Sequence, residues 1–175
     1  LKFEGNKLYL IKHTPLDNYM PDVEQLKANW AYVHEQIEAE NIVSGYALGF
    51  GGIAEAICKM SFGNGLDAKI NVDEKELFNY DYGSILVEAE SELNYPNAVL
   101  IGEVTDGEDS ELKINGVKFD LFDLMAANSA KFAQVYPDTA EAYCKDVVPA
   151  GLEGVKTFKA KKSDLRYKGE PVQTP

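Results

Sequence analysis

The residues best suited to bind a ligand form a glycine-rich turn between two apolar segments. Gly49, Gly51 and Gly52 follow the apolar run 42–48 and precede Ile53, where apolar residues begin to recur at helical spacing. Glycines let the backbone adopt positive φ angles and approach a ligand, and the first amides of a helix point outward without intrahelical partners. The turn is therefore a candidate phosphate-binding loop.

The same turn also has a purely structural interpretation. Its spacing matches neither the dinucleotide-binding Gly-x-Gly-x-x-Gly pattern nor the Gly-x-x-x-x-Gly-Lys-Ser/Thr pattern. A tight turn that packs a helix on a sheet also uses glycines, and the local chemistry favours this interpretation over phosphate binding. Under both interpretations we expect a strand, a glycine turn and a helix over 51–62.

The residue patterns of catalysis and metal binding are missing from the sequence. Cys58 and Cys144 form no Cys-x-x-Cys pair, and His13 and His34 lie at no metal-ligand spacing from them or from each other. Glu55 falls off the apolar face of its helix, so we expect it to be solvated. The sequence predicts no catalytic residue, no metal site and no cofactor held by this chain alone.

Composition restricts the class of protein. The chain has 175 residues, of which 45% are hydrophobic, which is enough for one folded domain with a substantial core. A net charge of −12 argues against a nucleic-acid partner. No apolar run reaches the roughly 20 residues that span a bilayer, and no charged-then-apolar leader opens the chain. We expect a soluble, cytoplasmic protein with no membrane partner.

The first half of the chain predicts a strand over 7–12 and a long helix over 22–40. Asp22 and Gln25 have the spacing of a capping box at the start of this helix. Trp30 is expected in the core, because burial is the usual role of its large ring. The helix has one apolar stripe at spacings of three and four, formed by Val23, Leu26, Trp30, Val33 and Ile37.

The second half predicts several short strands and a last long helix. Asn115-Gly116 separates two of these strands, and this dipeptide is a strong hairpin signal because both residues tolerate positive φ. We expect three antiparallel strands around this hairpin, and Asp120 can cap a helix over 120–136. The predicted strands cover 68–72, 85–88, 98–105, 111–114 and 117–119. The fold class is α/β (α+β), a mixed sheet with an antiparallel hairpin portion and packed helices.

The end of the chain differs in character from the rest. Residues 154–175 carry six basic residues against two acidic ones and show little periodicity. From residue 159 onward we expect an extended, solvated linker, with docking on an acidic neighbour as the alternative. The predicted organisation is a single domain over 1–158 followed by a basic linker over 159–175.

Several segments of the sequence resemble motifs of one known family. The stretch 47–63, with its Gly51-Gly52 pair, resembles the Asp-Val-Ser-Asp-Gly-Gly-Leu motif of the C-terminal domain shared by aminoimidazole ribonucleotide synthetase and its relatives. Leu77-Phe78-Asn79 is similar to that domain's Leu-Phe-Ser/Asn-Glu segment, and Gly102-Glu103-Val104 to its Gly-x-Val step. The resemblance covers roughly 7–137 in element order. It is greatest to the second such domain of large phosphoribosylformylglycinamidine synthases, where a hairpin, a long helix and a linker to a glutaminase domain follow.

The resemblance implies an enzyme of which this chain would be a part. The parent would be a glutamine-dependent ligase of purine biosynthesis that uses ATP and Mg²⁺ to convert formylglycinamide ribonucleotide to formylglycinamidine ribonucleotide. Its partners would be sibling domains of the same polypeptide, an ATP-binding N-terminal-like domain and the glutaminase. Without those domains the chain would be inactive.

The sequence departs from the family motif at chemically important positions. Ala47, Gly49 and Phe50 stand where the motif has Asp, Ser and Asp, and Tyr80 replaces its Glu. These changes remove groups that orient a substrate or hold a cation. We therefore expect a mainly architectural domain; the alternative is an independent phosphate- or nucleotide-binding module that uses the Gly49–Ile53 loop. The candidate ligand-binding residues are Gly49, Gly51, Gly52, Ile53 and Asn79.

Overall fold

The computed structural model describes residues 1–106, 109–130 and 135. The chain forms two compact units, Leu1–Gln134 and Val135–Pro175, and the described residues other than Val135 belong to the first. The expected end of the last helix at residue 136, the domain boundary at 158, the linker over 159–175 and Cys144 lie outside the described residues.

The described part of the chain is a seven-stranded mixed sheet with four helices. The strand order is β2-β4-β1-β5-β3-β6-β7, and β3 and β6 are parallel whereas the other neighbours are antiparallel. This arrangement confirms the predicted fold class. The elements are β1 (Lys7–Ile11), α1 (Val23–Glu38), β2 (Ile42–Ala47), α2 (Gly52–Phe62), β3 (Asp67–Ile70), α3 (Glu74–Leu77), β4 (Ile85–Ala89), β5 (Ala98–Thr105), β6 (Glu111–Ile114), β7 (Val117–Asp120) and α4 (Leu121–Ala130).

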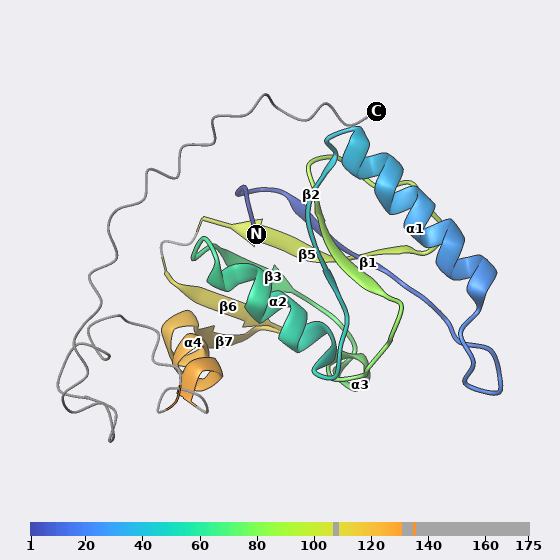
Figure 1. Cartoon of the computed structure of the whole chain (residues 1–175). Coiled ribbons are helices and arrows are strands. Elements are labelled where there is room, and N and C mark those ends of the chain that lie inside the picture. The colour runs from blue at the N-terminus through green and yellow to red at the C-terminus, as the bar shows by residue number, and fades with distance from the viewer. Residues whose placement is uncertain (107–108, 131–134, 136–175) are drawn as a thin grey trace, which may run out of the picture. The chain divides into compact units, whose positions relative to one another are not determined.

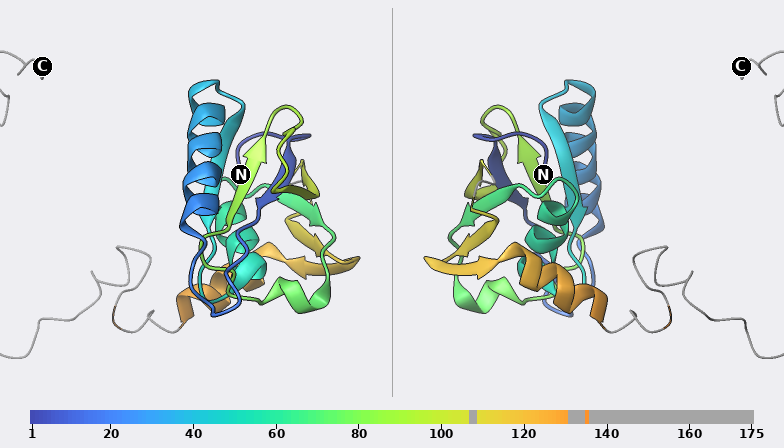
Figure 2. Two further views of the ribbon diagram at one scale, coloured as in Figure 1. Left: turned by 90° about the vertical axis from the view of Figure 1, so that its right-hand side faces the viewer. Right: turned by 90° about the vertical axis from the view of Figure 1, so that its left-hand side faces the viewer.

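Helices cover both faces of the sheet. In Figure 1 the edge strand β2 runs in front, with α2 on one side of the sheet and α1 on the other, and Figure 2 shows the same layers turned by 90°. The central strand β1 contributes to both cores: Leu8 and Leu10 pack with the α2 side, whereas Tyr9 and Ile11 pack with the α1 side. Because side chains alternate along a strand, a strand buried on both faces reads as a continuous apolar run.

The expected three-stranded antiparallel arrangement is wrong in one respect. The β6–β7 hairpin forms as predicted, with φ of 52° at Asn115 and 81° at Gly116. However, β5 pairs with β1 and β3, and β3 lies between β5 and β6. This insertion buries Ala68 and Ile70 of β3 in the α2-side core. Local sequence patterns do not record this burial, because it joins segments far apart in the chain.

The expected apolar stripe of α1 faces the core only in part. Trp30 is 53% exposed, so the prediction that it is a core residue is wrong. The fully or nearly fully buried residues of the helix are Asn29 and Val33. The exposed part of the stripe also includes Val23 and Ile37.

The orientation of α1 is explained by the hydrogen bonds of Asn29. Its Nδ2 donates to the Lys12 carbonyl oxygen at 3.1 Å. Its Oδ1 accepts from the Tyr95 hydroxyl at 2.9 Å and from Asn97 Nδ2 at 2.8 Å. A buried amide is stable only where its hydrogen bonds are made, so this set of partners holds Asn29 inward and leaves Trp30 on the surface.

A buried carboxylate joins the start of the chain to the sheet. Glu88, in β4, is fully buried. Its oxygens accept hydrogen bonds from the backbone amides of Lys2 and Phe3 at 2.8 and 3.0 Å, from Asn6 Nδ2 at 2.9 Å and from Ser44 Oγ at 2.8 Å. A buried charge is tolerated only when its lone pairs are satisfied in this way, so these donors and Glu88 depend on each other.

We expect Glu88→Gln to lower the free energy of unfolding by about 3 kcal/mol, because an amide in place of one carboxylate oxygen leaves buried N–H groups without an acceptor. Urea denaturation followed by circular dichroism measures this change. Glu90→Gln, at the exposed residue two positions later, is the matched control and should stay within about 0.5 kcal/mol of the wild type. Equal stability of the two variants would contradict a role for the carboxylate.

Candidate functional site

The glycine turn joins β2 to α2, as the sequence predicts. Gly51 is the N-cap of α2, and the Gly52 amide donates to the Gly49 carbonyl oxygen at 3.1 Å. Gly52 has a φ of +62°, and a Cβ atom there would lie 2.6 Å from the Asn79 carbonyl oxygen and 2.9 Å from that of Leu77. Gly52 is thus required both by its positive φ and by the close approach of two backbone segments.

The candidate ligand-binding residues are brought together only in part. Gly52 lies against the main chain of Asn79, but the Asn79 side chain donates to Asp81 Oδ1 at 2.7 Å on the exposed surface. Ile53 is fully buried in the α2-side core, and Gly49 and Gly51 are half-buried. The turn and residue 79 are therefore neighbours through their backbones rather than through side chains that converge on a ligand.

Glu55 is not merely solvated, contrary to expectation. Its Oε2 accepts from the Gly51 amide at 2.9 Å, and its Oε1 accepts from Lys59 Nζ at 2.6 Å. The Lys59 hydrogen bond contributes most, and the Gly51 amide next, to a pKa of the Glu55 carboxyl below its usual range. A carboxylate therefore already interacts with the positive end of α2, where a phosphate would bind.

A spacing in the sequence indicates the contacts of Glu55, although the recurrence of apolar residues along the helix does not. Glycine, glutamate and lysine follow one another at spacings of four, as Gly51, Glu55 and Lys59. A Cβ at Gly51 would lie 2.5 Å from Glu55 Cβ, so the glycine makes room for the glutamate to fold back over the turn. Residues four apart on a helix are neighbours, so the pattern predicts these contacts once the start of the helix is known.

Exposed aromatic rings lie next to the turn. Phe50 stacks on Tyr80 with ring centroids 5.3 Å apart and planes within 5°, and Tyr80 contacts Tyr82 at 6.3 Å with planes tilted by 44°. Their exposed fractions are 78% for Phe50, 54% for Tyr80 and 60% for Tyr82. Such a surface suits stacking with another ring or burial against a partner. Local sequence patterns do not indicate this stack, because residues 50 and 80 meet only in the fold.

A hollow of about 320 Å³ beside the turn is apolar. Residues of α2, α3, the β6–β7 hairpin and α4 line it; Glu55 is its one charged side chain among the described residues, and no basic residue contributes. Cys58 also lines the hollow, and burial raises the pKa of its thiol, which disfavours the nucleophilic thiolate. The hollow therefore offers no complementary charge to a phosphate.

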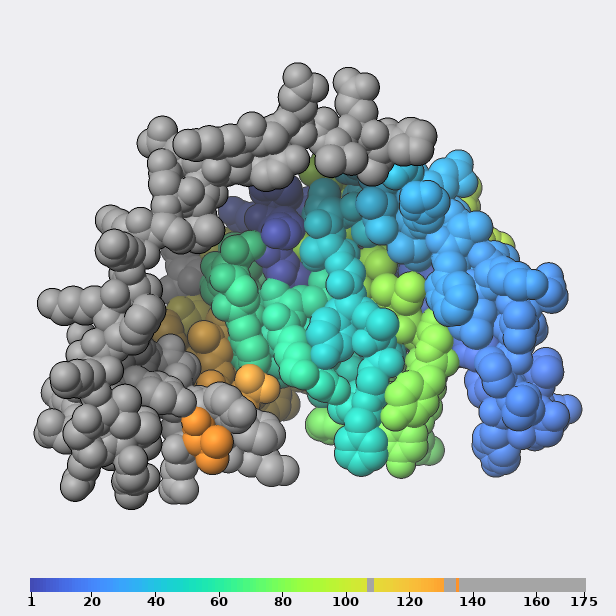
Figure 3. All heavy atoms as spheres, viewed as in Figure 1, coloured from blue at the N-terminus to red at the C-terminus, as the bar shows by residue number. Residues whose placement is uncertain are grey.

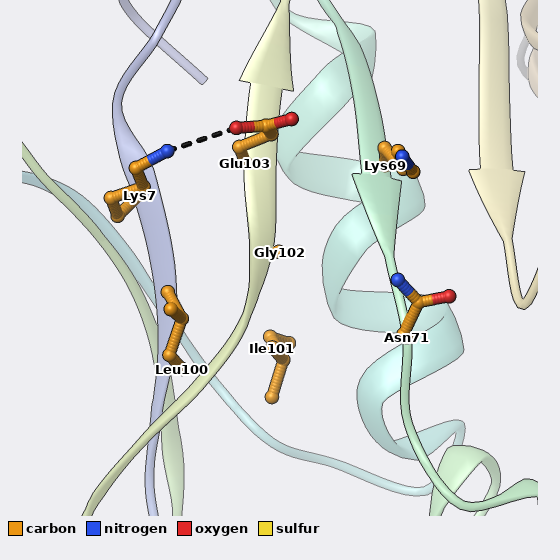
Figure 4. Close-up of a pocket in the computed structure, with 7 residues that line it drawn as sticks. All are labelled: Lys7, Lys69, Asn71, Leu100, Ile101, Gly102 and Glu103. Carbon is orange, nitrogen blue, oxygen red and sulfur yellow. Dashed lines mark hydrogen bonds and ion pairs between the residues drawn. The ribbon is translucent and has the colours of Figure 1, made fainter.

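A second hollow, of about 300 Å³, lies on the sheet face opposite α2 (Figure 4). Lys7 Nζ lies 2.9 Å from Glu103 Oε2, which raises the pKa of Lys7 and lowers that of Glu103, and Lys69 lies on the neighbouring strand. Both members of the ion pair are more than 40% exposed, so water screens their charges. Two lysines against one glutamate leave this lining with a net charge of +1, but the charges lie at an exposed surface, where water weakens their attraction for an anion.

Within residues 1–106, 109–130 and 135 no group of three or more histidine, cysteine, aspartate or glutamate side chains is placed to hold a metal ion. In the same residues no helix is both long and apolar enough to cross a membrane.

Comparisons with known proteins find likeness in structure but not in sequence. No protein-family model matches the chain, and no curated protein matches it. Phosphoribosylformylglycinamidine synthase II of Thermotoga maritima superposes with a TM-score of 0.57 at 14% identity over 70% of this chain and 26% of the synthase. T. maritima PurL complexed with AMPPCP gives 0.54 at 13% identity over 71% and 26%. Escherichia coli HypE, a hydrogenase maturation protein, gives 0.49 at 15% identity over 67% and 49%.

These likenesses concern the fold. The chain has the mixed-sheet fold that the resemblance to the synthetase C-terminal domain predicts. It spans 26% of the length of the T. maritima synthase, so the activity of a whole synthase does not follow from the match.

We expect Gly52→Ala to lower the free energy of unfolding by about 3 kcal/mol, from the cost of a left-handed alanine and from the overlap of its Cβ with the Asn79 carbonyl. Gly65→Ala is the matched control: Gly65 has nearly the same φ of +65°, but nothing lies within 4 Å of its would-be Cβ. That variant should lose only about 1 kcal/mol. Thermal or urea unfolding measures both, and equal losses would mean that the backbone contact contributes nothing.

The lowered pKa of Glu55 predicts a dependence on pH. A carboxyl whose pKa is lower in the folded state stabilises the protein above its unfolded pKa, and this contribution is lost as the pH falls through the folded pKa. Glu55→Gln should therefore be less stable than the wild type at about pH 7, and the difference should shrink toward about pH 3. Urea unfolding of both proteins across this range measures it, and a constant difference would argue against the ionised carboxylate as the cause.

Proposed function

We propose that this chain is a C-terminal-type domain of a phosphoribosylformylglycinamidine synthase-like ligase of purine biosynthesis, and that its role there is architectural. The fold likeness to the T. maritima synthase and the sequence phrases at 47–63, 77–79 and 102–104 support this proposal. In such a cytoplasmic parent, sibling domains would bind ATP and Mg²⁺ and release ammonia from glutamine. This chain would support and connect them.

The observation that carries the architectural role is the contact between Glu55 and the glycine turn. The Glu55 carboxylate, itself paired with Lys59, accepts the Gly51 amide at the N-terminus of α2, so an incoming phosphate would have to displace it. Gly52 is explained by its packing against Asn79. The hollow beside the turn contains no basic side chain among the described residues. The turn therefore works as a packing element between β2, α2 and the segment after α3.

A second candidate function rests on the stacked rings beside the turn. Phe50 and Tyr80 present exposed aromatic faces on which the base of a nucleotide can stack. In this alternative the chain is an independent module that binds a nucleotide or a phosphorylated small molecule through the Gly49–Ile53 loop. Glu55 would then have to release the Gly51 amide.

Calorimetric titration of the chain with ADP and with ribose 5-phosphate separates the two functions. For the architectural domain we expect no binding up to about 1 mM ligand, because the Glu55 carboxylate already occupies the Gly51 amide at the turn. Binding of ADP that is lost in Phe50→Ala and kept in the control Tyr19→Ala would support the nucleotide module instead. Tyr19 is 91% exposed, so its substitution removes a surface ring without disturbing the core.

An activity assay of the same protein provides an independent check. The chain alone, supplied with ATP, Mg²⁺, glutamine and formylglycinamide ribonucleotide, should form no product. Turnover would contradict the architectural role, whatever the titration shows. Gly52→Asp is unsuitable as a binding-site variant in either experiment, because the backbone contact at this position would make it unfold.

A further inference from the structure

The residue His13 joins three segments that are far apart along the chain. It follows β1, is 3% exposed, and its backbone amide donates to Ser84 Oγ at 2.9 Å. On the ring, Nδ1 lies 2.9 Å from the Tyr82 carbonyl oxygen, and Nε2 accepts a hydrogen bond from the Asp22 amide at 3.2 Å. His13 therefore ties the start of α1 to the segment that leads into β4.

Gly83 packs directly against this ring. Its φ is +93°, and a Cβ atom there would lie 3.0 Å from His13 Nδ1 and 2.6 Å from Leu26 Cδ2. The ring is thus enclosed between α1 and the segment before β4, which lie beside each other in Figure 3 in blue and yellow-green. Because a closely packed side chain has few alternative positions, the ring cannot exchange one hydrogen-bond partner for another by turning in place.

The two hydrogen bonds of the ring require its neutral form. A backbone amide can only donate, so Nε2 is the unprotonated nitrogen, and Nδ1 carries the proton that the Tyr82 carbonyl oxygen accepts. In a protonated ring both nitrogens donate. Nδ1 would then keep its bond to Tyr82, whereas Nε2 and the Asp22 amide would be two donors that face each other. Of the two ring bonds, protonation therefore breaks the one to α1.

The bond that protonation breaks lies at the first turn of α1. Asp22 is the N-cap of this helix: its Oδ1 accepts from the Gln25 amide at 3.0 Å, and its carbonyl oxygen accepts from the Leu26 amide at 2.9 Å. Gln25 Oε1 in turn accepts from the Thr14 amide at 2.7 Å. The first turn of a helix depends on such caps, because its first amides have no partners within the helix. Loss of the His13 bond would loosen this turn and the connection before it.

The charged groups around the ring act in opposite directions. Asp81, in the segment before β4, interacts electrostatically with His13, and the carboxylates of Asp81 and Asp22 favour a positive charge on the ring. Lys12 opposes this charge, but its Nζ is paired with Glu76 Oε1 at 2.5 Å. Burial is the main cause of an Asp81 pKa above its usual range. Histidine ordinarily changes its charge between about pH 5 and 8, so mild acidification is the condition under which this balance matters.

We propose that the contact between His13 and Asp22 is a pH-sensitive switch. At about pH 7 and above, the neutral ring holds α1 to the segment before β4. On acidification the protonated ring stays with that segment and releases the Asp22 amide, so that residues 14–21 and the first turn of α1 open while the sheet stays folded. The stabilisation belongs to the neutral ring, so it is present at higher pH and is lost as the pH falls. This inference does not require the assignment to purine biosynthesis.

The test is hydrogen exchange of the full chain, measured by NMR at about pH 7.5 and pH 5.5. Exchange itself depends on pH, so each rate is divided by that of an unstructured chain at the same pH to give a protection factor. The protection factors of the Asp22 and Leu26 amides should fall at least about tenfold on acidification, whereas that of Ile57, in the core of α2, should change less than about twofold. The His13 ring should be the Nδ1–H tautomer at the higher pH, and its titration should coincide with the loss of protection.

His13→Gln keeps an acceptor that cannot be protonated. The glutamine Oε1 can take the place of Nε2 as acceptor for the Asp22 amide, so protection there should not depend on pH. His34→Gln is the matched control, because His34 is the other histidine of the chain and is exposed on α1; it should show the wild-type loss. Asp81→Asn should move the loss to lower pH, because it removes a negative charge that favours the protonated ring.

Four results would overturn the proposal. One is a wild-type protection factor at Asp22 and Leu26 that is the same at both pH values. Another is an equal fall at Ile57, because acid would then unfold the whole domain rather than the start of α1. The third is a loss of protection that persists in a folded His13→Gln protein. The fourth applies even if that variant does not fold: a His13 ring in the Nε2–H tautomer, or one whose titration does not coincide with the loss of protection.

Discussion

The hydrogen bonds that the buried Glu88 carboxylate accepts are the interaction on which much of the structure depends. Its bond to Ser44 crosses from β4 to the edge strand, next to an irregularity in the β2–β4 register between Ile42 and Ser44. A one-residue slip of β2 would turn every later side chain to the opposite face. The bond to Glu88 holds Ser44 on the α2 side of the sheet, so Gly45 and Ala47 lie on the α1 side. It thereby fixes the register of β2 and the position at which the glycine turn begins.

Polar anchors also determine how α1 lies on the sheet. Asn29 holds the middle of the helix, and His13 holds its start. His13 Nε2 accepts from the Asp22 amide at 3.2 Å, so Nδ1 carries the proton that is donated to the Tyr82 carbonyl oxygen at 2.9 Å. The buried ring is therefore the neutral Nδ1–H tautomer. Because buried polar groups must keep their partners, these bonds outweigh the gain from burying Trp30.

The sequence predicts the features that local contacts determine, and it misses those that depend on contacts between distant segments. The Asp22 cap and the Asn115-Gly116 hairpin are local, and the structure confirms both. The position of β3 between β5 and β6 depends on partners far along the chain, as do the buried face of α1 and the stack of Phe50 on Tyr80. The sequence locates the glycine turn, but the partner of Gly52, the Asn79 backbone, lies 27 residues away and leaves no local pattern.

The fold shows where the residues that depart from the family motif lie. Phe50 and Tyr80, which replace an aspartate and a glutamate of the motif, stack on each other at the surface beside the turn. Ala47, which replaces another aspartate, lines an apolar hollow between β2 and α1. At Phe50 and Tyr80 a carboxylate that could bind a cation or substrate is exchanged for a ring that gains by burial against a surface. In the proposed architectural role, Phe50 and Tyr80 offer contact area in place of the chemistry of a site, whereas Ala47 and Gly49 only remove polar groups.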